Sequence, residues 1–381
     1  MALPALTLPP LSLYVHVPWC IRKCPYCDFN SHQRPQVLPE ADYINALLED
    51  LQQDLSLVQG RELVSIFIGG GTPSLFSAAS FDTLLRAIEA LIPFRTDIEI
   101  TLEANPGTFE QDKFSAYRQT GINRLSIGVQ SFDPHYLQLL GRVHGREEAL
   151  RAADIARRAG FDNFNLDLMF GLPEQSTSRA LADLEQAIAC EPTHVSWYQL
   201  TLEPNTEFYK RPPVLPEDDA LADMQEAGFA RLAASGFERY EVSAFSQPGR
   251  AAHHNTHYWE FGDYLGIGAG AHGKLTLPES SAVIRTRKTR MPAHYLQSPL
   301  TRMAEQHQVP VTELPLEFMM NALRLNAGVP LALYPARTGL EPDPAVLETL
   351  RSRGLLALQP DRLQATARGL QHLNAVLEEF L

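Results

Sequence analysis

The sequence predicts an α/β protein: a partial barrel of strand–helix units followed by a small helical domain. Short apolar runs alternate with amphipathic segments at intervals of roughly 30 residues, which is typical of βα units around a parallel sheet. The chain has 381 residues, of which 45% are hydrophobic and 20% charged. That composition provides for a sizeable core and excludes a disordered chain.

Six apolar runs define the predicted strands, and an amphipathic segment follows each one. The strands are Leu13–Val17, Val64–Ile68, Ile98–Leu102, Leu125–Val129, Phe164–Met169 and Val195–Leu200. The helices are Asp42–Val58, Phe81–Leu91, Lys113–Thr120, Arg146–Ala159, Arg179–Ala189 and Ala220–Ala234. Gly121, Gly160 and Gly236 follow three of these helices, where a left-handed residue is expected. In such barrels the chemistry lies at the carboxyl ends of the strands.

The rest of the chain departs from this repeat. Pro212–Pro216 predicts a loop, and Ala251–Arg290, dense in glycine, histidine and aromatic residues, predicts loop and short strands that carry function. From about Pro315 the sequence is rich in leucine and alanine at helical spacing. We therefore expect a barrel at 1–245, a barrel extension at 246–314 and a helical, winged-helix-like domain at 315–381.

Charge and hydropathy exclude several classes of protein. The net charge is −13, from 32 basic and 45 acidic residues, so a general nucleic-acid binder is not expected. The apolar start, MALPALTLPPLSLYVHVPWC, has no basic residue and is broken by prolines, so it predicts neither a signal peptide nor a membrane span. We expect a soluble, cytoplasmic protein.

The four cysteines indicate a metal centre and not a disulfide framework. Three of them, Cys20, Cys24 and Cys27, form a C-x3-C-x2-C cluster within eight residues. Such thiolates can converge on an iron–sulfur cluster, with three cysteines holding three of four irons. A zinc site with His16 or His32 as fourth ligand is the alternative, although zinc sites more often combine two separated ligand pairs. Cys190 is expected to be a buried apolar residue.

Two further features follow predicted strands. Gly69–Pro73 reads GGGTP, where consecutive glycines allow close backbone approach and offer unencumbered amide groups. Alone this could be a plain strand-to-helix turn, but beside the cysteine cluster it predicts a seat for the amino end of a small cofactor. Asp167 interrupts the apolar run Phe164–Met169, and a buried carboxylate needs a partner.

Together these motifs resemble the radical S-adenosylmethionine (SAM) superfamily, and in particular its oxygen-independent coproporphyrinogen oxidase-like group. Within that group the sequence is most similar to the haem chaperone family. The segments that carry the resemblance are Leu11–Asn30, GGGTP, Glu103–Pro106, Ile127–Phe132, Leu140–His144 and Asn165–Pro173.

The resemblance implies a radical SAM barrel that holds a [4Fe–4S] cluster on the three cysteines and SAM on the unique iron. Tyr14 would flank the cluster, and Tyr26, the aromatic residue before Cys27, would join the cofactor site. The implied SAM contacts are Gly70, Gly71 and Thr72, with Glu103, Gln130, Arg142 and Asp167 as the remaining polar wall.

Two departures argue against the oxidase. The oxidase resembles C-x3-C-x2-C-x-C, and Phe29 stands where its fourth cysteine would be. Only thirteen residues precede Tyr14, too few for the N-terminal extension that helps the oxidase hold its substrate.

One motif favours the chaperone. His254, Asn255, Tyr258 and Trp259 match the H-N-x-x-Y-W pattern of haem chaperones. A neutral imidazole is a good axial ligand for haem iron, and the aromatic rings can pack on a porphyrin. His253 and His257 are alternative ligands, and an ordinary packed corner is the alternative to any haem site.

Two nearby segments have less specific interpretations. The basic run Arg285, Arg287, Lys288 and Arg290 predicts an exposed strand edge protected by charge, with haem propionates as an alternative partner. Gly266–Gly273 lacks the strand-then-helix setting of a dinucleotide fingerprint and predicts a close-approach loop near the cluster or SAM.

We therefore expect a cluster- and SAM-binding haem chaperone that delivers haem to apo-haemoproteins such as respiratory enzymes. The resemblance implies a haem donor such as a storage ferritin, acceptors near the inner face of the cell membrane and homodimerisation that depends on the cluster. The alternatives are a coproporphyrinogen III oxidase and, from another class, a zinc-bound structural module.

Overall fold

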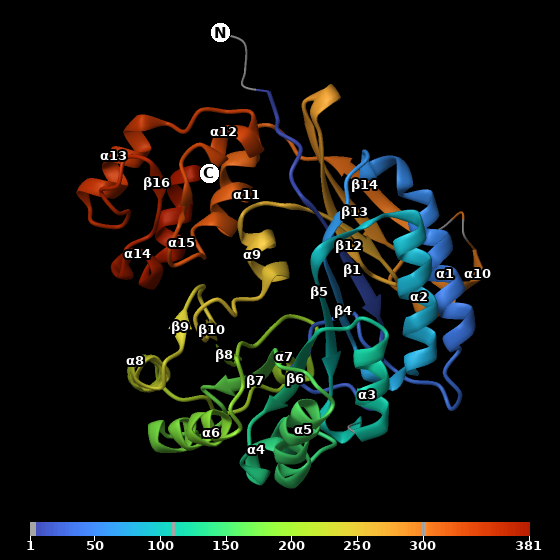
Figure 1. Ribbon diagram of the computed structural model, residues 1–381. Coiled ribbons are helices and arrows are strands. Elements are labelled where there is room, and N and C mark those ends of the chain that lie inside the picture. Colours follow the sequence, from blue (N-terminus) through green and yellow to red (C-terminus); the bar gives the residue numbers. More distant parts are fainter. Residues whose placement is uncertain (1–4, 109–110, 299, 301) are drawn as a thin grey trace.

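The computed structural model describes residues 5–381 except 109, 110, 299 and 301. Residues 1–4, the beginning of the segment for which no signal peptide is expected, lie outside the described residues. The central feature is a twelve-stranded sheet in the order β14-β13-β12-β11-β1-β4-β5-β6-β7-β8-β10-β9. Its two edge strands do not pair with each other, so the sheet forms an open, partial barrel (Figure 1).

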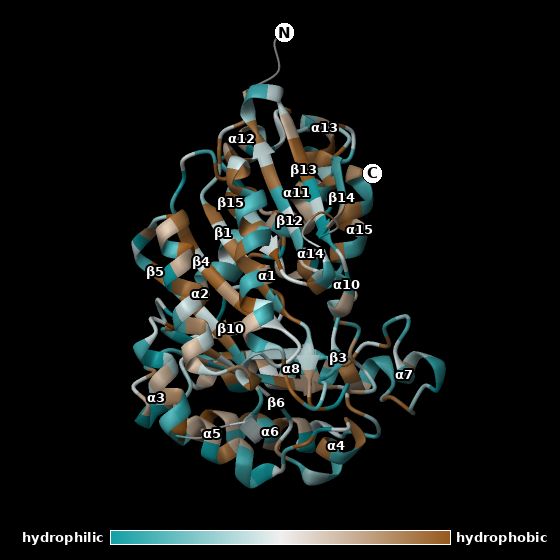
Figure 2. Ribbon diagram, turned by 90° about the vertical axis from the view of Figure 1, so that its right-hand side faces the viewer, coloured by the Kyte–Doolittle hydropathy of each residue, from teal (hydrophilic) through white to brown (hydrophobic). Residues whose placement is uncertain are grey.

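The predicted parallel strands form the middle of this sheet, side by side and in chain order. All six predicted strands are confirmed, and β11 adds a seventh parallel strand beside β1. They are β1 (Leu11–Val17), β4 (Leu63–Gly70), β5 (Phe94–Ala104), β6 (Arg124–Gln130), β7 (Phe164–Phe170), β8 (His194–Gln199) and β11 (Asp263–Ile267). Most residues of β1 and β4 are buried, and the brown stretches of these strands in Figure 2 mark their hydrophobic residues.

Helices pack along the outside of the parallel strands, except the short α7, which lies beside the cysteine loop (Figure 1). They are α1 (Glu40–Gln53), α2 (Ala78–Leu91), α3 (Gln111–Gln119), α4 (Pro134–Leu139), α5 (Arg146–Arg158), α6 (Thr177–Ala189), α7 (Glu207–Lys210) and α8 (Asp218–Ala234). The predicted helix over Asp42–Val58 ends at Gln53 and continues as a short 3-10 turn. Gly121, Gly160 and Gly236 have positive φ angles at helix ends, as expected.

Antiparallel strands extend both ends of the sheet. One extension consists of β12 (His272–Leu277), β13 (Ala282–Lys288) and β14 (Met303–Gln308), and the other of β9 (Glu238–Arg239) and β10 (Ala244–Ser246). The expected extra strands are therefore confirmed. The prediction of only loop and strand over Ala251–Arg290 is wrong in one respect, because His253–Trp259 forms helix α9. Its i, i+3 and i+4 spacing turns His254, His257 and Tyr258 toward the interior.

The prediction of an exposed strand edge at the basic run is also wrong. β13 lies between β12 and β14, so its backbone is paired on both sides. Lys288 is buried and bonds to Asp50 and Asp54 on or beside α1. Arg285 pairs with Glu317 on α11. Arg287 pairs with Glu305. Three of the four cationic residues of the run therefore have specific acidic partners.

The C-terminal helices have a second hydrophobic core of their own. The remaining elements are α10 (Pro292–Gln297), α11 (Leu314–Ala322), α12 (Leu333–Thr338), α13 (Pro344–Ser352), α14 (Ala367–Gln371) and α15 (Leu373–Leu377), with the small strands β2 (Trp19–Cys20), β3 (His32–Gln33), β15 (Val329–Pro330) and β16 (Arg362–Leu363). β15 and β16 form a two-stranded ribbon beside these helices. The exact domain boundaries stay predictions.

Candidate cluster and cofactor site

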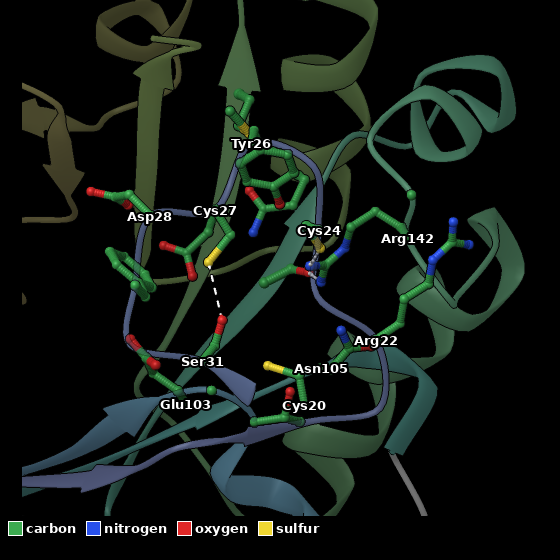
Figure 3. A pocket seen from close by; sticks show the side chains of 18 of the residues that line it. Cys20, Arg22, Cys24, Tyr26, Cys27, Asp28, Ser31, Glu103, Asn105 and Arg142 are labelled. Carbon is green, nitrogen blue, oxygen red and sulfur yellow. Dashed lines mark hydrogen bonds between the residues drawn. The ribbon is translucent and has the colours of Figure 1, made fainter. Parts of the chain in front are cut away.

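A cavity of about 490 Å³ opens at the carboxyl ends of the parallel strands. All three clustered cysteines line it, around the same space on one loop (Figure 3). Eleven of the twelve residues predicted for the cluster and SAM line this cavity, which are Cys20, Cys24, Cys27, Tyr26, Gly70, Gly71, Thr72, Glu103, Gln130, Arg142 and Asp167. The remaining one, Tyr14, lies in a neighbouring cavity described below.

The cysteine loop is closed at its base. Trp19 and Cys20 pair with His32 and Gln33 in a short parallel ribbon, so Cys20 lies at the base of the loop and Cys24 and Cys27 lie within it. The Arg142 guanidinium donates to Cys24 Sγ at 3.5 Å, and Cys27 Sγ lies 3.6 Å from Ser31 Oγ. Burial raises the pKa of Cys20 to about 11, so metal binding there must displace a proton.

The spacing of the three thiols fits a cluster better than a single metal ion. In the part of the chain that the structure describes, no three histidine, cysteine or acidic side chains are close enough together to chelate one ion. A [4Fe–4S] cluster binds each cysteine through a different iron, so its ligands stand further apart. The two candidate fourth ligands for zinc have other partners, since His16 bonds to the Asn30 carbonyl and His32 to the Asn30 side chain.

The glycines of GGGTP allow close backbone approach, but the predicted free amide groups are not observed. Gly70 N–H donates to Glu103 Oε2 at 3.0 Å. The amides of Gly71 and Thr72 donate to the carbonyls of Val17 and Trp19, each at 2.7 Å. A side chain at Gly71 would come within 2.6 Å of the Trp19 carbonyl, so the glycine is required by the neighbouring chain. The amides of this turn join it to the cysteine loop and are not available to a ligand.

Two partly buried carboxylates face the cavity from β5 and β7, the strands on either side of β6. Asp167 on β7 accepts hydrogen bonds from Ser126 and Asn165 at 3.0 and 2.8 Å. The predicted partners of this carboxylate are thus present. Burial and the charge of Asp167 raise the pKa of Glu103 on β5 to about 7. Burial also raises the pKa of Asp167. Such perturbed carboxyl groups in a cavity are typical of a ligand site.

Sequence reasoning missed Tyr198, which completes the wall beside the predicted residues Gln130 and Arg142. Tyr198, on β8, donates to Gln130 Oε1 at 2.6 Å, and Gln130 has a positive φ of 71° at the end of β6. Arg142 also donates to the Gly128 carbonyl, which fixes its guanidinium beside Cys24. Tyr198 lies near the carboxyl end of the sixth predicted strand, so the rule that sites lie at carboxyl ends of strands could have identified it.

A second cavity, of about 620 Å³, shares part of its wall with the first. Asp28, Phe29, Gly70 and Glu103 line both. The second cavity is otherwise formed by Tyr14, His16, Asn30, Tyr258, Tyr264, Gly270, His272, Arg287 and Arg290. It therefore lies between the cysteine loop and the antiparallel end of the sheet.

The four predicted haem-binding residues of segment 254–259, here called the HNTHYW segment, lie in different surroundings. Tyr258 lines the second cavity and stacks on Tyr264. His254 is only 4% exposed, lies against Phe67, and its Nδ1 is 2.8 Å from Ser65 Oγ. The other two face the C-terminal side, where Asn255 Nδ2 donates to the Tyr240 hydroxyl at 3.4 Å and Trp259 stacks under the Arg324 guanidinium. Only Tyr258 of the four lines either cavity.

The Gly266–Gly273 segment is the tight connection between β11 and β12. Gly268 approaches so closely that a side chain there would come within 2.4 Å of the His16 carbonyl. Asn30, three residues after Cys27, donates from Nδ2 to the carbonyls of Ala269 and Arg290, each at 2.8 Å. The predicted close approach is confirmed, and it is to the cysteine loop.

Comparisons with known proteins agree with this geometry. The Radical SAM superfamily model matches residues 14–187, and the HemN C-terminal domain model matches residues 309–372. Coproporphyrinogen III oxidase (HemN) from Escherichia coli has the same fold, with a TM-score of 0.82 over 98% of this chain and 90% of that chain at 23% identity. The fold and the site thus define a radical SAM protein with a HemN-type C-terminal domain.

Full-length relatives narrow this class. The chain is 52% identical to heme chaperone HemW from Escherichia coli over 98% of this chain and 99% of the relative. It is 50% identical to heme chaperone HemW from Haemophilus influenzae and 33% identical to that from Bacillus subtilis, over 98% and 97% of this chain and 98% and 99% of those relatives. The chain belongs to the heme chaperone HemW family.

Membership in the radical SAM superfamily implies a [4Fe–4S] cluster and SAM, and the first cavity fits both. When bound, this pair supplies one-electron radical chemistry. The cysteine loop would hold the cluster, and the GGGTP turn with the two partly buried carboxylates would border SAM. No helix among the described residues is long and apolar enough to span a membrane.

Proposed function

We propose that this protein binds haem and transfers it to apo-haemoproteins such as respiratory enzymes, with the cluster and SAM in the first cavity. The observation that carries the proposal is end-to-end similarity to proteins named heme chaperones, at up to 52% identity. Phe29 supports it, because an exposed phenylalanine stands where the oxidase would have a fourth cysteine. Tyr258, from the HNTHYW segment, supplies aromatic surface in the second cavity.

An anaerobic haem titration of cluster-reconstituted protein, followed by Soret absorbance, tests this proposal. We expect saturable binding near one haem per chain, and transfer of that haem to an added apo-cytochrome. His254→Ala, measured in parallel, tests the HNTHYW segment, because it removes the imidazole ring that packs against Tyr258. The absence of stable haem binding, together with SAM-dependent decarboxylation of coproporphyrinogen III, would replace the chaperone by the oxidase.

We also propose partners and location on the basis of the family resemblance. A haem-storage ferritin is a suitable donor, and apo-cytochromes at the inner face of the cell membrane are suitable acceptors for a cytoplasmic protein. Homodimerisation would depend on the cluster. Sedimentation of the cluster-loaded and metal-free protein tests the last point, since a dimer that persists without iron would contradict it.

A further inference from the structure

We propose that haem occupies the second cavity, with His272 as an axial iron ligand and Arg290 and Arg287 facing the propionates. This inference rests on the proposed haem-binding function and assigns its site. It locates the ligand at the start of β12, outside the HNTHYW segment. The cavity volume of about 620 Å³ lies within the range of pockets that hold cofactors.

Strand register places the proposed groups on one face of the sheet. His272 is directly opposite Arg287 in the antiparallel pair of β12 and β13. Directly opposed side chains project from the same face with their Cβ atoms about 5 Å apart. Tyr264, opposite Lys274 on the adjacent strand, lies on the same face and lines the same cavity. A ligand over this face would therefore contact the imidazole, a guanidinium and an aromatic ring together.

His272 is the cavity histidine with a free imidazole. Within the described residues no hydrogen bond to its side chain is found, and the ring is exposed. The other cavity histidine, His16, bonds to the Tyr14 hydroxyl and the Asn30 carbonyl. In the HNTHYW segment, His254 bonds to Ser65 and His257 to the Asp263 carbonyl. His16 therefore has both ring nitrogens engaged, whereas His254 and His257 are buried and line neither cavity.

The environment of His272 favours the neutral ring that metals require. Partial desolvation of the ring, followed by the charges of Arg287, Arg285 and Arg290, lowers the pKa of His272. The acidic Glu305 acts in the opposite direction and is the weakest influence. A neutral imidazole offers a nitrogen lone pair to ferric or ferrous iron.

Two arginines at the rim can receive carboxylates. The Arg290 guanidinium is exposed and has no side-chain partner among the described residues, so its charge is available to a propionate. Arg287 bonds to one oxygen of Glu305 and is partly exposed. The acidic groups of the cavity, Asp28 and Glu103, are those it shares with the first cavity. The carboxylate end of a haem therefore belongs at the arginine rim, away from that shared wall.

Phe29 provides the apolar contact. Its side chain is 59% exposed, although it lines both cavities. The exposed ring is thus available to a ligand that enters the second cavity. Tyr258 and Tyr264 stack at 4.1 Å between ring centres and line the same cavity. A flat aromatic macrocycle would cover these three rings.

The first experiment compares His272→Ala with His253→Ala in ferric haem titrations of cluster-reconstituted protein. His253, the exposed histidine immediately before the HNTHYW segment, lies outside both cavities and is the matched control. We expect His272→Ala to weaken haem binding at least about tenfold, the lower end of losses on removing a metal-site group. We expect it also to shift the Soret band, while His253→Ala and the cluster absorbance stay unchanged.

A second variant tests whether the effect comes from the loss of the iron ligand itself. His272→Gly leaves room for free imidazole, which should restore the wild-type Soret position in proportion to its concentration. Haem binding that is unchanged in both His272 variants, with a wild type that binds, would overturn this inference and leave the proposed function intact. A wild type that binds no haem would overturn the proposed function and this inference with it.

The propionate contact has its own control. Arg290→Gln should weaken binding of haem about tenfold, as expected for loss of a charge-assisted contact, but leave binding of haem dimethyl ester unchanged. An equal loss for both porphyrins would overturn the assignment of the propionates to this rim.

Discussion

The two ends of the central sheet bury different kinds of residue. The parallel strands β1 and β4 to β8 are buried mainly through aliphatic and aromatic side chains. The antiparallel end buries charge. Lys288 on β13 bonds to two carboxylates, and Lys274 on β12 bonds to Asp263, which is also held by Arg61.

This difference corresponds to the two cavities. The cluster cavity lies where apolar strands end, so its few polar residues are conspicuous and converge on one space. The second cavity is bounded by strands whose polar residues already satisfy one another in pairs. Its candidate ligand groups, His272 and Arg290, have no side-chain partner among the residues that the structure describes. Three predictions test how independent these regions are.

The largest effect is expected in the cluster cavity. Cys20→Ser should abolish the cluster, because the loop has only three cysteines and the cluster needs all three as ligands. The fold should survive, since Asn30 ties the loop to the carbonyls of Ala269 and Arg290 without any metal. Iron analysis and the brown cluster absorbance measure the first point, and circular dichroism the second.

Cys190→Ala is the matched control, because this cysteine is buried at the end of α6, away from the loop. It should keep its iron. Iron near the wild-type content in Cys20→Ser would contradict the cluster assignment. Unfolding of the metal-free loop variant would show that the two regions depend on each other.

The sequence predicts the parallel half well for a physical reason. A carboxylate such as Asp167 within an apolar run can only be tolerated with partners, so the residue pattern alone is enough to mark a site there. The same reasoning does not identify His272. Its surroundings combine the cysteine loop with strands more than 200 positions further along the chain, so no local pattern marks it. The helix α9 escapes prediction because its buried face consists of histidine and tyrosine, which hide the apolar periodicity.

The next largest effect is expected from the antiparallel end. Lys288→Met removes the only described cation bonded to Asp50 and Asp54 and leaves two buried carboxylates facing each other. Breaking a buried ion pair from one side costs about 3–5 kcal/mol. We therefore expect a lower urea midpoint for unfolding and an unchanged m-value, because unfolding exposes the same surface.

Lys210→Met is the control for Lys288→Met, because Lys210 is exposed at the end of α7 and should change stability by less than about 0.5 kcal/mol. A loss below about 1 kcal/mol in Lys288→Met would mean that the two carboxylates share a proton or reach water. In that case the buried charges at the antiparallel end of the sheet would not depend on fixed ion pairs.

The smallest effect concerns Glu103, which borders both cavities. Its pKa is about 7 in the folded protein and 4.5 ordinarily, so between these values the folded state binds more protons than the unfolded state. Stability should therefore be highest below pH 4.5 as far as this group is concerned, and should decrease as the pH rises to about 7. Metal-free protein should lose a few degrees of thermal midpoint across this window.

Glu103→Gln should remove that part of the pH dependence, because the amide carries no proton to lose and its oxygen can still accept from Gly70 N–H. The exposed Glu226→Gln is the control and should follow the wild type. The comparison is made by thermal unfolding at several pH values between 4.5 and about 8. An unchanged slope in Glu103→Gln would place the titration on another buried acid, with Asp167 across the cavity as the next to replace.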